Sequence, residues 1–220
     1  QGETLGRRIA AAHRPALAWQ VGAALARIHA VDMTGAPELR ISQPLAEVQH
    51  QADWHARHGT VRPVFQLALR WLADHAPVDV ARPSLVHGDF RNGNLIVGED
   101  GLRAVLDWEL AHLGDPMEDL GWLCVTSWRY GRLELPVGGF GTREELFAGY
   151  AEAGGQVDAA RVHYWEVLGS LKWGVICQSM AHSYLSGAER NAERAAIGRR
   201  ASEAEIDLLE LLVPRPRQAA

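Results

Sequence analysis

The chain has 220 residues, of which 47% are hydrophobic and 22% charged, a composition typical of a globular protein with enough apolar residues to form a core. The formal net charge of −5 is spread along the sequence without a block of lysine and arginine, so nothing indicates nucleic-acid binding. No apolar run approaches the roughly 20 residues of a membrane-spanning helix, and residues 1–8 lack the apolar segment of a signal peptide.

Helical periodicity dominates the first third of the sequence. Apolar side chains recur every three or four positions over residues 14–30, which predicts a first helix. Ser42 can cap a second helix that runs to about His58. A third helix is expected over residues 63–75, and residues 77–83 are expected to form a loop.

The character of the sequence changes after this loop. Residues 84–87 are a short apolar run that leads into a segment rich in Gly, Asp and Asn. Residues 95–97 and 103–107 are two strand candidates, and residues 99–101 between them carry a turn signal. The sequence therefore predicts a β-hairpin flanked by polar residues.

The remainder of the chain returns to helical patterns. A helix is expected over residues 115–127, with Asp115 as its N-cap and Pro116 in its first turn. A Gly- and Pro-rich loop precedes a short helix over 142–153, which begins with a capping box. A long helix is expected over 157–184 and a last helical region over 188–212. The predicted fold is mainly α with one small β-hairpin.

The two cysteines, Cys124 and Cys177, lie far apart inside apolar helical patterns and form no CxxC motif. We interpret both as buried thiols rather than as a disulfide or a redox pair. This cysteine usage favours a reducing compartment, so we expect a cytoplasmic location.

Three polar side chains, Asp89, Asn94 and Asp107, stand out beside the predicted strands. Phosphoryl transfer needs a carboxylate that orients the attacking hydroxyl group, and oxygen ligands that hold Mg²⁺ between the phosphates. One loop with an aspartate and an asparagine can supply both, and an aspartate at the end of the next strand can complete the metal site. The alternative interpretation is that all three are turn or cap residues.

The motifs around these residues resemble those of the aminoglycoside phosphotransferase family, a branch of the protein-kinase-like fold. Residues 87–94, HGDFRNGN, resemble its catalytic loop, and residues 105–109, VLDWE, resemble its metal-binding segment. Residues 114–120, GDPMEDL, resemble the pattern that follows it. The tail pattern over 164–187 and 197–200 resembles a subgroup related to the kinase-like domains fused to acyl-CoA dehydrogenases.

The resemblance implies a role for each polar residue of these motifs. Asp89 would be the catalytic base, and Asn94 and Asp107 would be ligands of Mg²⁺. His87 would brace the loop, and Asp119 would hold the loop backbone by hydrogen bonds. The implied reaction transfers phosphate from ATP or GTP to a hydroxyl group of a small molecule, whose identity the sequence does not indicate.

Five further residues are candidates for contacts with substrate or phosphate, each with an ordinary structural alternative. The candidates are Arg91, Glu109, Tyr164, Glu166 and Trp173. Arg91 is more typical of a solvated arginine. Glu109 is equally consistent with a ligand contact and with a structural partner for an arginine. The three on the long helix are equally consistent with core and surface positions.

The resemblance also implies an N-terminal lobe for which this sequence shows no signal. The only lysine is Lys172, inside a predicted helix, and no Gly-rich loop followed by a strand occurs before residue 80. Residues 2–5 resemble the segment that follows the hinge between lobes. We therefore interpret residues 1–220 as a single C-terminal lobe, with little or no kinase activity alone. A non-catalytic kinase-like module that binds a small molecule or a protein is the alternative.

Overall fold

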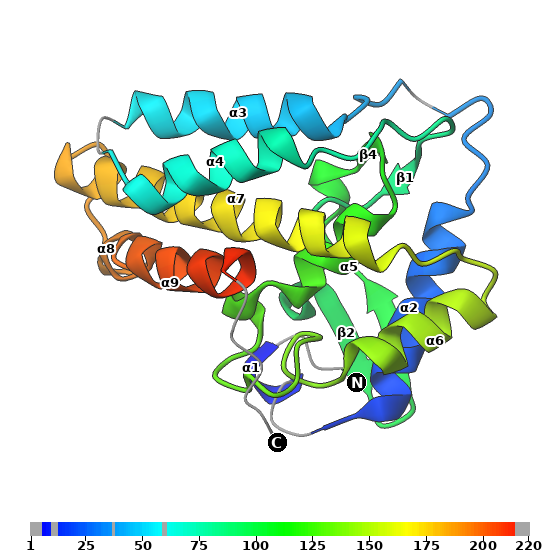
Figure 1. The fold of residues 1–220 in the computed structure, drawn as a ribbon. Helices are drawn as coiled ribbons and strands as arrows, with labels where there is room; N and C mark the ends of the chain where they lie inside the picture. The colour runs from blue at the N-terminus through cyan, green and yellow to red at the C-terminus, as the bar shows by residue number, and fades with distance from the viewer. Residues whose placement is uncertain (1–5, 10–12, 37, 59–60, 214–220) are drawn as a thin grey trace, which may run out of the picture. The chain divides into compact units, whose positions relative to one another are not determined.

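The computed structural model describes residues 6–9, 13–36, 38–58 and 61–213 (Figure 1). Contacts within the chain group it into two compact units, which we describe separately. Unit 1 comprises residues 1–43 and 77–166, and unit 2 comprises residues 44–76 and 167–220. The hinge-like segment 2–5, the helix stop at Gly59 and the final prolines Pro214 and Pro216 lie outside the described residues.

Unit 1 contains four helices and the start of a fifth among its described residues. They are α1 (Gly6–Ile9), α2 (Pro15–His29), α5 (Met117–Cys124), α6 (Arg143–Glu152) and the first part of α7 (Ala159–Leu185). Helices α2 and α6 lie side by side (Figure 1). Their backbones touch, because a Cβ atom on Gly22 would lie 2.1 Å from the Leu146 carbonyl oxygen, and one on Gly149 would lie 2.0 Å from that of Trp19.

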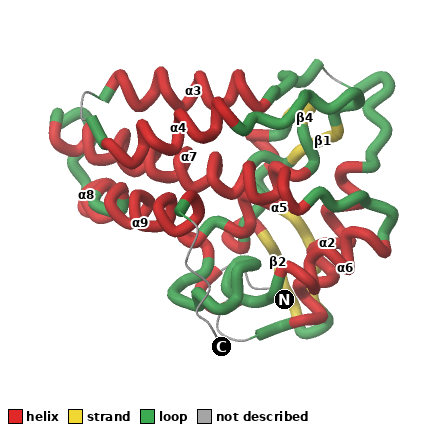
Figure 2. Tube along the Cα trace, viewed as in Figure 1, coloured by secondary structure: helices red, strands yellow, loops and turns green. Residues whose placement is uncertain are grey.

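The strands of unit 1 form two small antiparallel sheets, drawn yellow in Figure 2. The predicted hairpin is confirmed: β2 (Leu95–Gly98) pairs with β3 (Gly101–Val105), with Leu95 opposite Val105. The second sheet pairs β1 (Ser84–Val86) with β4 (His112–Gly114). The sequence does not predict β4, because three residues show no periodicity and their pairing with β1 is decided by tertiary contacts.

Short 3₁₀ turns carry the polar motifs at the ends of these strands. They are η1 (Asn92–Asn94), directly before β2, and η2 (Trp108–Leu110), between β3 and β4; a third turn, η3 (Thr126–Trp128), follows α5 instead of a strand. The helix predicted over residues 115–127 is accordingly shorter, since α5 ends at Cys124 and the chain continues into η3. The Thr142 capping box predicted for α6 is present, with Thr142 and Glu145 bonded to each other's backbone N–H groups. Large side chains that are fully buried in unit 1 include Phe90, Leu120, Leu123, Phe140 and Leu146.

All the regular secondary structure described in unit 2 is helical. This unit contains α3 (Pro44–Arg57), α4 (Pro63–Asp74), the rest of α7, α8 (Ala192–Gly198) and α9 (Ala201–Leu212). The last helical region is thus two helices. Its α8 ends where Gly198 meets the backbone of Ala181, leaving no room for a Cβ atom. The expected fold class, mainly α with a small β-hairpin, is confirmed. None of the helices described here is long and apolar enough to span a membrane.

Candidate active site

The carboxylate of Asp89 lies among three side-chain donors. The Arg91 Nε–H group lies 3.1 Å from each of the two carboxylate oxygens. Asn94 donates from Nδ2 to Oδ2 at 2.8 Å, and the indole N–H of Trp122 donates to Oδ1 at 2.8 Å. The Asp89 side chain is 16% exposed, so a small ligand can reach a carboxylate that the protein already orients. This geometry suits a group that accepts or directs a proton.

The backbone of the loop that carries Asp89 is held by a second carboxylate. Asp119, which is 0% exposed, accepts hydrogen bonds from the backbone N–H of His87 at 2.8 Å and of Gly88 at 3.0 Å. Gly88 has a φ of 81°, and a Cβ atom there would lie 2.6 Å from the carbonyl oxygen of Leu110. Only glycine therefore fits this turn of the loop.

The Asp119 carboxylate is ionised although it is buried. Burial acts to raise the pKa of Asp119, but the hydrogen bond and charge of His29 and the two backbone N–H groups outweigh it and hold the pKa below its usual range. His29 Nε2 lies 3.1 Å from Asp119 Oδ2, and His29 Nδ1 lies 2.9 Å from the hydroxyl group of Tyr150. The catalytic loop is thus attached to α2 and α6 through one buried carboxylate.

The imidazole of His87 joins the catalytic loop to the segment that follows the hairpin. Its Nδ1 accepts from the backbone N–H of Asp89 at 3.2 Å, so Nε2 carries the proton and donates to the carbonyl oxygen of Leu106 at 2.9 Å. The ring also contacts Trp108, with 4.6 Å between ring centroids. The brace implied for His87 therefore consists of two hydrogen bonds and one ring contact.

Asp107 directly follows Leu106, whose backbone is held by the catalytic loop. The N–H group of Leu106 donates to the carbonyl oxygen of Asn94 at 2.8 Å, so both backbone groups of Leu106 are tied to the catalytic loop. Asp107 itself is exposed and left-handed, with a φ of 68°. The structure thereby brings Asn94 and Asp107 to adjacent ends of the paired strands β2 and β3.

The donor atoms at these two positions fit a hard cation. Asn94 uses Nδ2 to bond the backbone oxygen and the carboxylate of Asp89, so Oδ1 is the atom of this amide that could bind a cation. The Asp107 carboxylate could supply a second oxygen. Among the described residues no group of three or more His, Cys, Asp or Glu side chains could hold a metal ion. Two protein oxygens with water and phosphate oxygens as further ligands are typical of Mg²⁺ sites.

The five further candidates lie in different settings. Arg91 stacks over Trp128, with its Cζ 5.1 Å from the ring centroid, and Glu109 is exposed on η2. Glu166 is buried with its two carboxylate oxygens bonded to Arg129 and Arg143. Such a closed ion pair favours the structural interpretation of Glu166.

The other two candidates are also enclosed by protein. Tyr164 is 2% exposed, and burial raises the pKa of its hydroxyl group. Trp173 belongs to unit 2, where the guanidinium of Arg200 stacks over it at 5.4 Å. These settings favour the structural interpretation of both residues, as for Glu166.

Several residues with contacts at the site are not singled out by the sequence. Trp122 binds the Asp89 carboxylate, and buried Asn92 donates to the carbonyl oxygens of Trp128 and Gly138. The predicted N-cap is one residue too early, because α5 begins at Met117 and Pro116 is its N-cap; Asp115, the residue before the cap, instead accepts from the Met117 N–H group. Asp115 additionally binds Arg161 and the indole of Trp165. A short motif gives no signal for these partners, because each lies on another element.

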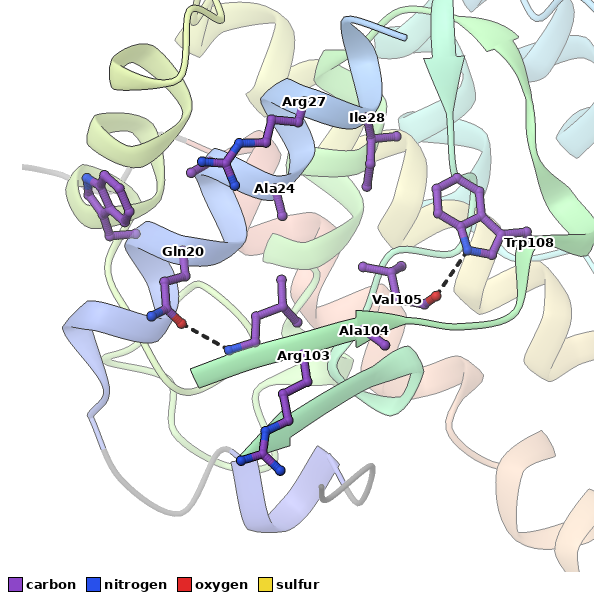
Figure 3. A pocket seen from close by; sticks show the side chains of 11 residues that line it. Gln20, Ala24, Arg27, Ile28, Arg103, Ala104, Val105 and Trp108 are labelled. Atoms are coloured by element: carbon purple, nitrogen blue, oxygen red, sulfur yellow. Dashed lines mark hydrogen bonds between the residues drawn. The ribbon is translucent and has the colours of Figure 1, made fainter. Parts of the chain in front are cut away.

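A cleft of about 550 Å³ lies beside the hairpin, between α2 and β3 (Figure 3). Its floor is apolar and small, with Ala24, Ala104 and Val105, and Trp108 closes one end. Gln20 crosses it to accept from the Leu102 N–H group at 3.0 Å. Asp89, Asn94 and Asp107 do not line this cleft. It touches the site only through Trp108.

The fold is that of a helical lobe of the protein-kinase-like class, and the polar motifs lie together at the ends of its hairpin. The chain belongs to the phosphotransferase enzyme family (APH), whose sequence model matches residues 1–156. The family expected from the motifs is therefore confirmed.

Relatives and solved structures extend this assignment. The chain is 30% identical to acyl-CoA dehydrogenase family member 11 of Gallus gallus over 71% of this chain and 22% of that protein, which confirms the expected subgroup. A Ralstonia eutropha protein provisionally assigned as an aminoglycoside phosphotransferase superposes with a TM-score of 0.75 at 24% identity, over 90% of this chain and 65% of that one. A choline/ethanolamine kinase family protein of Mesorhizobium loti has a TM-score of 0.66 at 19% identity, over 95% and 66% of the two chains. The chain thus spans about a fifth of the curated relative and about two thirds of these structures.

Proposed function

We propose that this chain carries the catalytic carboxylate and the magnesium ligands of an ATP- or GTP-dependent phosphotransferase whose acceptor is a hydroxyl group of a small molecule. The observation that carries the proposal is the carboxylate of Asp89. It is reachable from solvent, is oriented by Asn94 and Trp122, and lies on a loop whose backbone is fixed by Asp119. A turn residue would need none of these contacts.

In this proposal Asp89 accepts a hydrogen bond from the acceptor hydroxyl group and receives its proton as the oxygen attacks phosphorus. Arg91 already lies on the same carboxylate, so its guanidinium is within reach of negative charge that develops on the transferred phosphoryl group. We propose that Arg91 contacts phosphate. Exposed Glu109, two residues after Asp107, is proposed as an acceptor contact.

Asn94 Oδ1 and the Asp107 carboxylate are proposed to hold Mg²⁺ together with the nucleotide phosphates. When bound, the ion neutralises charge on the phosphates and aligns them for transfer. The protein positions the Asp107 ligand through the residue before it. The N–H and carbonyl groups of Leu106 are both hydrogen-bonded to the catalytic loop. His87 maintains this connection, and Asp119 maintains the loop, as the family resemblance implies.

Residues 1–220 are proposed to act as one C-terminal lobe of a cytoplasmic enzyme. The only lysine, Lys172, lies within α7, far along the chain from any strand that could place it on the phosphates. We therefore propose that these residues alone have little phosphotransferase activity. Nucleotide affinity is expected to be weak for the same reason, because half of the cradle that holds the phosphates is contributed by other residues.

The test is a screen of hydroxyl acceptors with the full-length protein, Mg²⁺ and either ATP or GTP, with residues 1–220 assayed in parallel. Asp89→Asn keeps the shape of the side chain and removes its basicity, so activity on the best acceptor should fall by about 10²- to 10⁴-fold. The matched control is Asp100→Asn, at an exposed aspartate on the turn of the same hairpin, which should keep full activity.

Two outcomes would contradict the proposal. Full activity of Asp89→Asn would show that this carboxylate is not the base. Failure of the full-length protein to bind nucleotide with or without Mg²⁺ would favour the non-catalytic module instead. Equal turnover by residues 1–220 and by the full-length protein would overturn only the proposed weakness of the isolated lobe.

A further inference from the structure

The crossing of α2 and α6 brings a tyrosine onto a buried histidine. Gly22 and Gly149 let the two backbones touch, and Tyr150 directly follows the second glycine. The hydroxyl group of Tyr150 lies 2.9 Å from Nδ1 of His29, which is the last residue of α2. The two side chains are buried, with 7% of His29 and 3% of Tyr150 exposed.

Each ring nitrogen of His29 has one hydrogen-bond partner: Asp119 at Nε2 and Tyr150 at Nδ1. The ionised carboxylate of Asp119 can only accept, so Nε2 of His29 carries a proton and donates to it at 3.1 Å. Nδ1 of His29 lies within hydrogen-bond distance of the Tyr150 hydroxyl group, which can donate to the ring or accept from it. Burial raises the pKa of Tyr150, and the charges of Asp119 and Asp115 raise it further, so the hydroxyl group stays protonated and available as a donor.

We propose that His29, held by Tyr150, is a positioning residue that fixes the Asp119 carboxylate and through it the backbone of the catalytic loop. Asp119 Oδ2 accepts from both His29 Nε2 and the N–H group of His87, so the rotamer that binds His29 is the one that binds the loop. The catalytic meaning of this role rests on the proposed function, whereas the positioning of the loop does not.

A neighbouring cavity explains why His29 needs a second partner. A space of about 470 Å³ is lined by both His29 and Tyr150, and also by Asp115 and Arg161. The charged groups of that wall are engaged with each other, since the Arg161 guanidinium bonds the Asp115 carboxylate. An imidazole without Tyr150 could turn toward this space and release Asp119. The tyrosine therefore selects the ring orientation that holds the loop.

Hydrogen exchange of the backbone amides of residues 87 and 88 tests the proposal on residues 1–220, without any activity measurement. His29→Ala should speed exchange at both amides by about tenfold or more beyond the change caused by lower global stability, because a hydrogen bond to a charged group is lost at the anchor. His29→Gln, whose amide can donate to Asp119, should restore most of the protection. Tyr150→Phe should give an intermediate acceleration.

The matched control is His55→Ala in unit 2, which also removes a buried, hydrogen-bonded histidine. It should lower global stability without a selective change at residues 87 and 88. The proposal is overturned if His29→Ala accelerates these amides no more than His55→Ala does at equal global stability, or if His29→Gln gives no rescue. Absence of phosphotransferase activity in the full-length protein would contradict the proposed function and leave this exchange result unaffected.

Discussion

The catalytic loop, residues 87–94, and the proposed metal segment, residues 105–109, meet at one hairpin but are held in different ways. The loop is anchored by the buried carboxylate of Asp119 on α5, which His29 of α2 also binds. Its own buried Asn92 side chain donates to the carbonyl oxygen of Gly138 in the loop before α6. The metal segment is exposed from Leu106 onward and is held mainly through the backbone of that residue.

This difference matches the work proposed for each part. A general base must keep its orientation before the substrate arrives, so the protein fixes Asp89 by its own contacts. A magnesium ligand completes its coordination only with the nucleotide, so Asp107 stays accessible. We expect mutations in the loop to change both stability and activity, and mutations in the metal segment to change activity alone.

The largest effect is expected at the anchor of the loop. Asp119→Ala leaves His29 and two backbone N–H groups buried without their acceptor, so the free energy of unfolding should fall by about 3–5 kcal/mol. Urea unfolding followed by circular dichroism measures it. A loss below about 1 kcal/mol would show that the loop does not depend on this carboxylate.

A slightly smaller effect is expected where the loop turns. Gly88→Ala places a Cβ atom against the Leu110 carbonyl oxygen at a residue with positive φ, which should cost about 2–3 kcal/mol of unfolding free energy. The control is Gly35→Ala, whose φ is 77° but whose Cβ atom would meet open space. Its cost should be limited to backbone strain, about 1 kcal/mol. Equal losses for the two variants would contradict the close approach at Gly88.

Acid should weaken the loop in a defined pH range. The pKa of Asp119 is lowered in the folded protein, so its contribution is present above the unfolded pKa of about 4 and is lost as pH falls through the lower folded value. For this single group the slope of unfolding free energy is at most about 1.4 kcal/mol per pH unit. Asp119→Asn should remove that part of the slope below about pH 4. An unchanged slope would indicate that Asp119 is not ionised.

Removing the Trp122 indole N–H group, which donates to Asp89, should have a moderate effect on both stability and activity. Trp122→Phe retains an aromatic ring and removes the indole N–H group, so unfolding free energy should fall by about 1 kcal/mol. The kcat of the full-length protein should fall while the KM for nucleotide stays the same, because Asp89 loses orientation and the metal ligands do not. A change in nucleotide KM alone would place Trp122 elsewhere in the mechanism.

The smallest stability effect is expected in the metal segment. Asp107→Asn keeps a residue that tolerates positive φ, and the side chain is exposed, so unfolding free energy should change by less than about 0.5 kcal/mol. Magnesium-dependent activity of the full-length protein should nevertheless be lost. If this variant were as unstable as Asp119→Ala, the contrast between loop and metal segment would be wrong.

The sequence predicts the parts of the site that are close together along the chain. The HGDFRNGN motif, the hairpin and the aspartate at its end are all encoded by local spacing and turn chemistry, and the hairpin is present as expected. Asp119 follows from the family pattern, and its bonds to the backbone of residues 87 and 88 are present in the structure. The catalytic roles of these residues stay predictions.

Partners far along the chain could not be predicted in this way. Trp122 lies 33 residues from Asp89, His29 lies 90 residues from Asp119, and Tyr150 lies 121 residues from His29. The long helix expected over 157–184 is present as α7, but the roles of its side chains could not be predicted, since residues 164–171 are all buried and offer no exposed face to interpret. Glu166 is consequently found between two arginines, which helical periodicity does not indicate.

By itself the sequence determined the helical class, the hairpin, the family and the identity of the residues proposed for chemistry, because these depend on periodicity and short motifs. Only the tertiary structure decided how firmly each of these residues is held in place. Touching backbones at Gly22 and Gly149 bring Tyr150 to His29, and buried charges find their partners only after the helices pack. Burial makes an unpaired polar group costly, so packing selects the one arrangement that satisfies Asp119 and fixes Asp89.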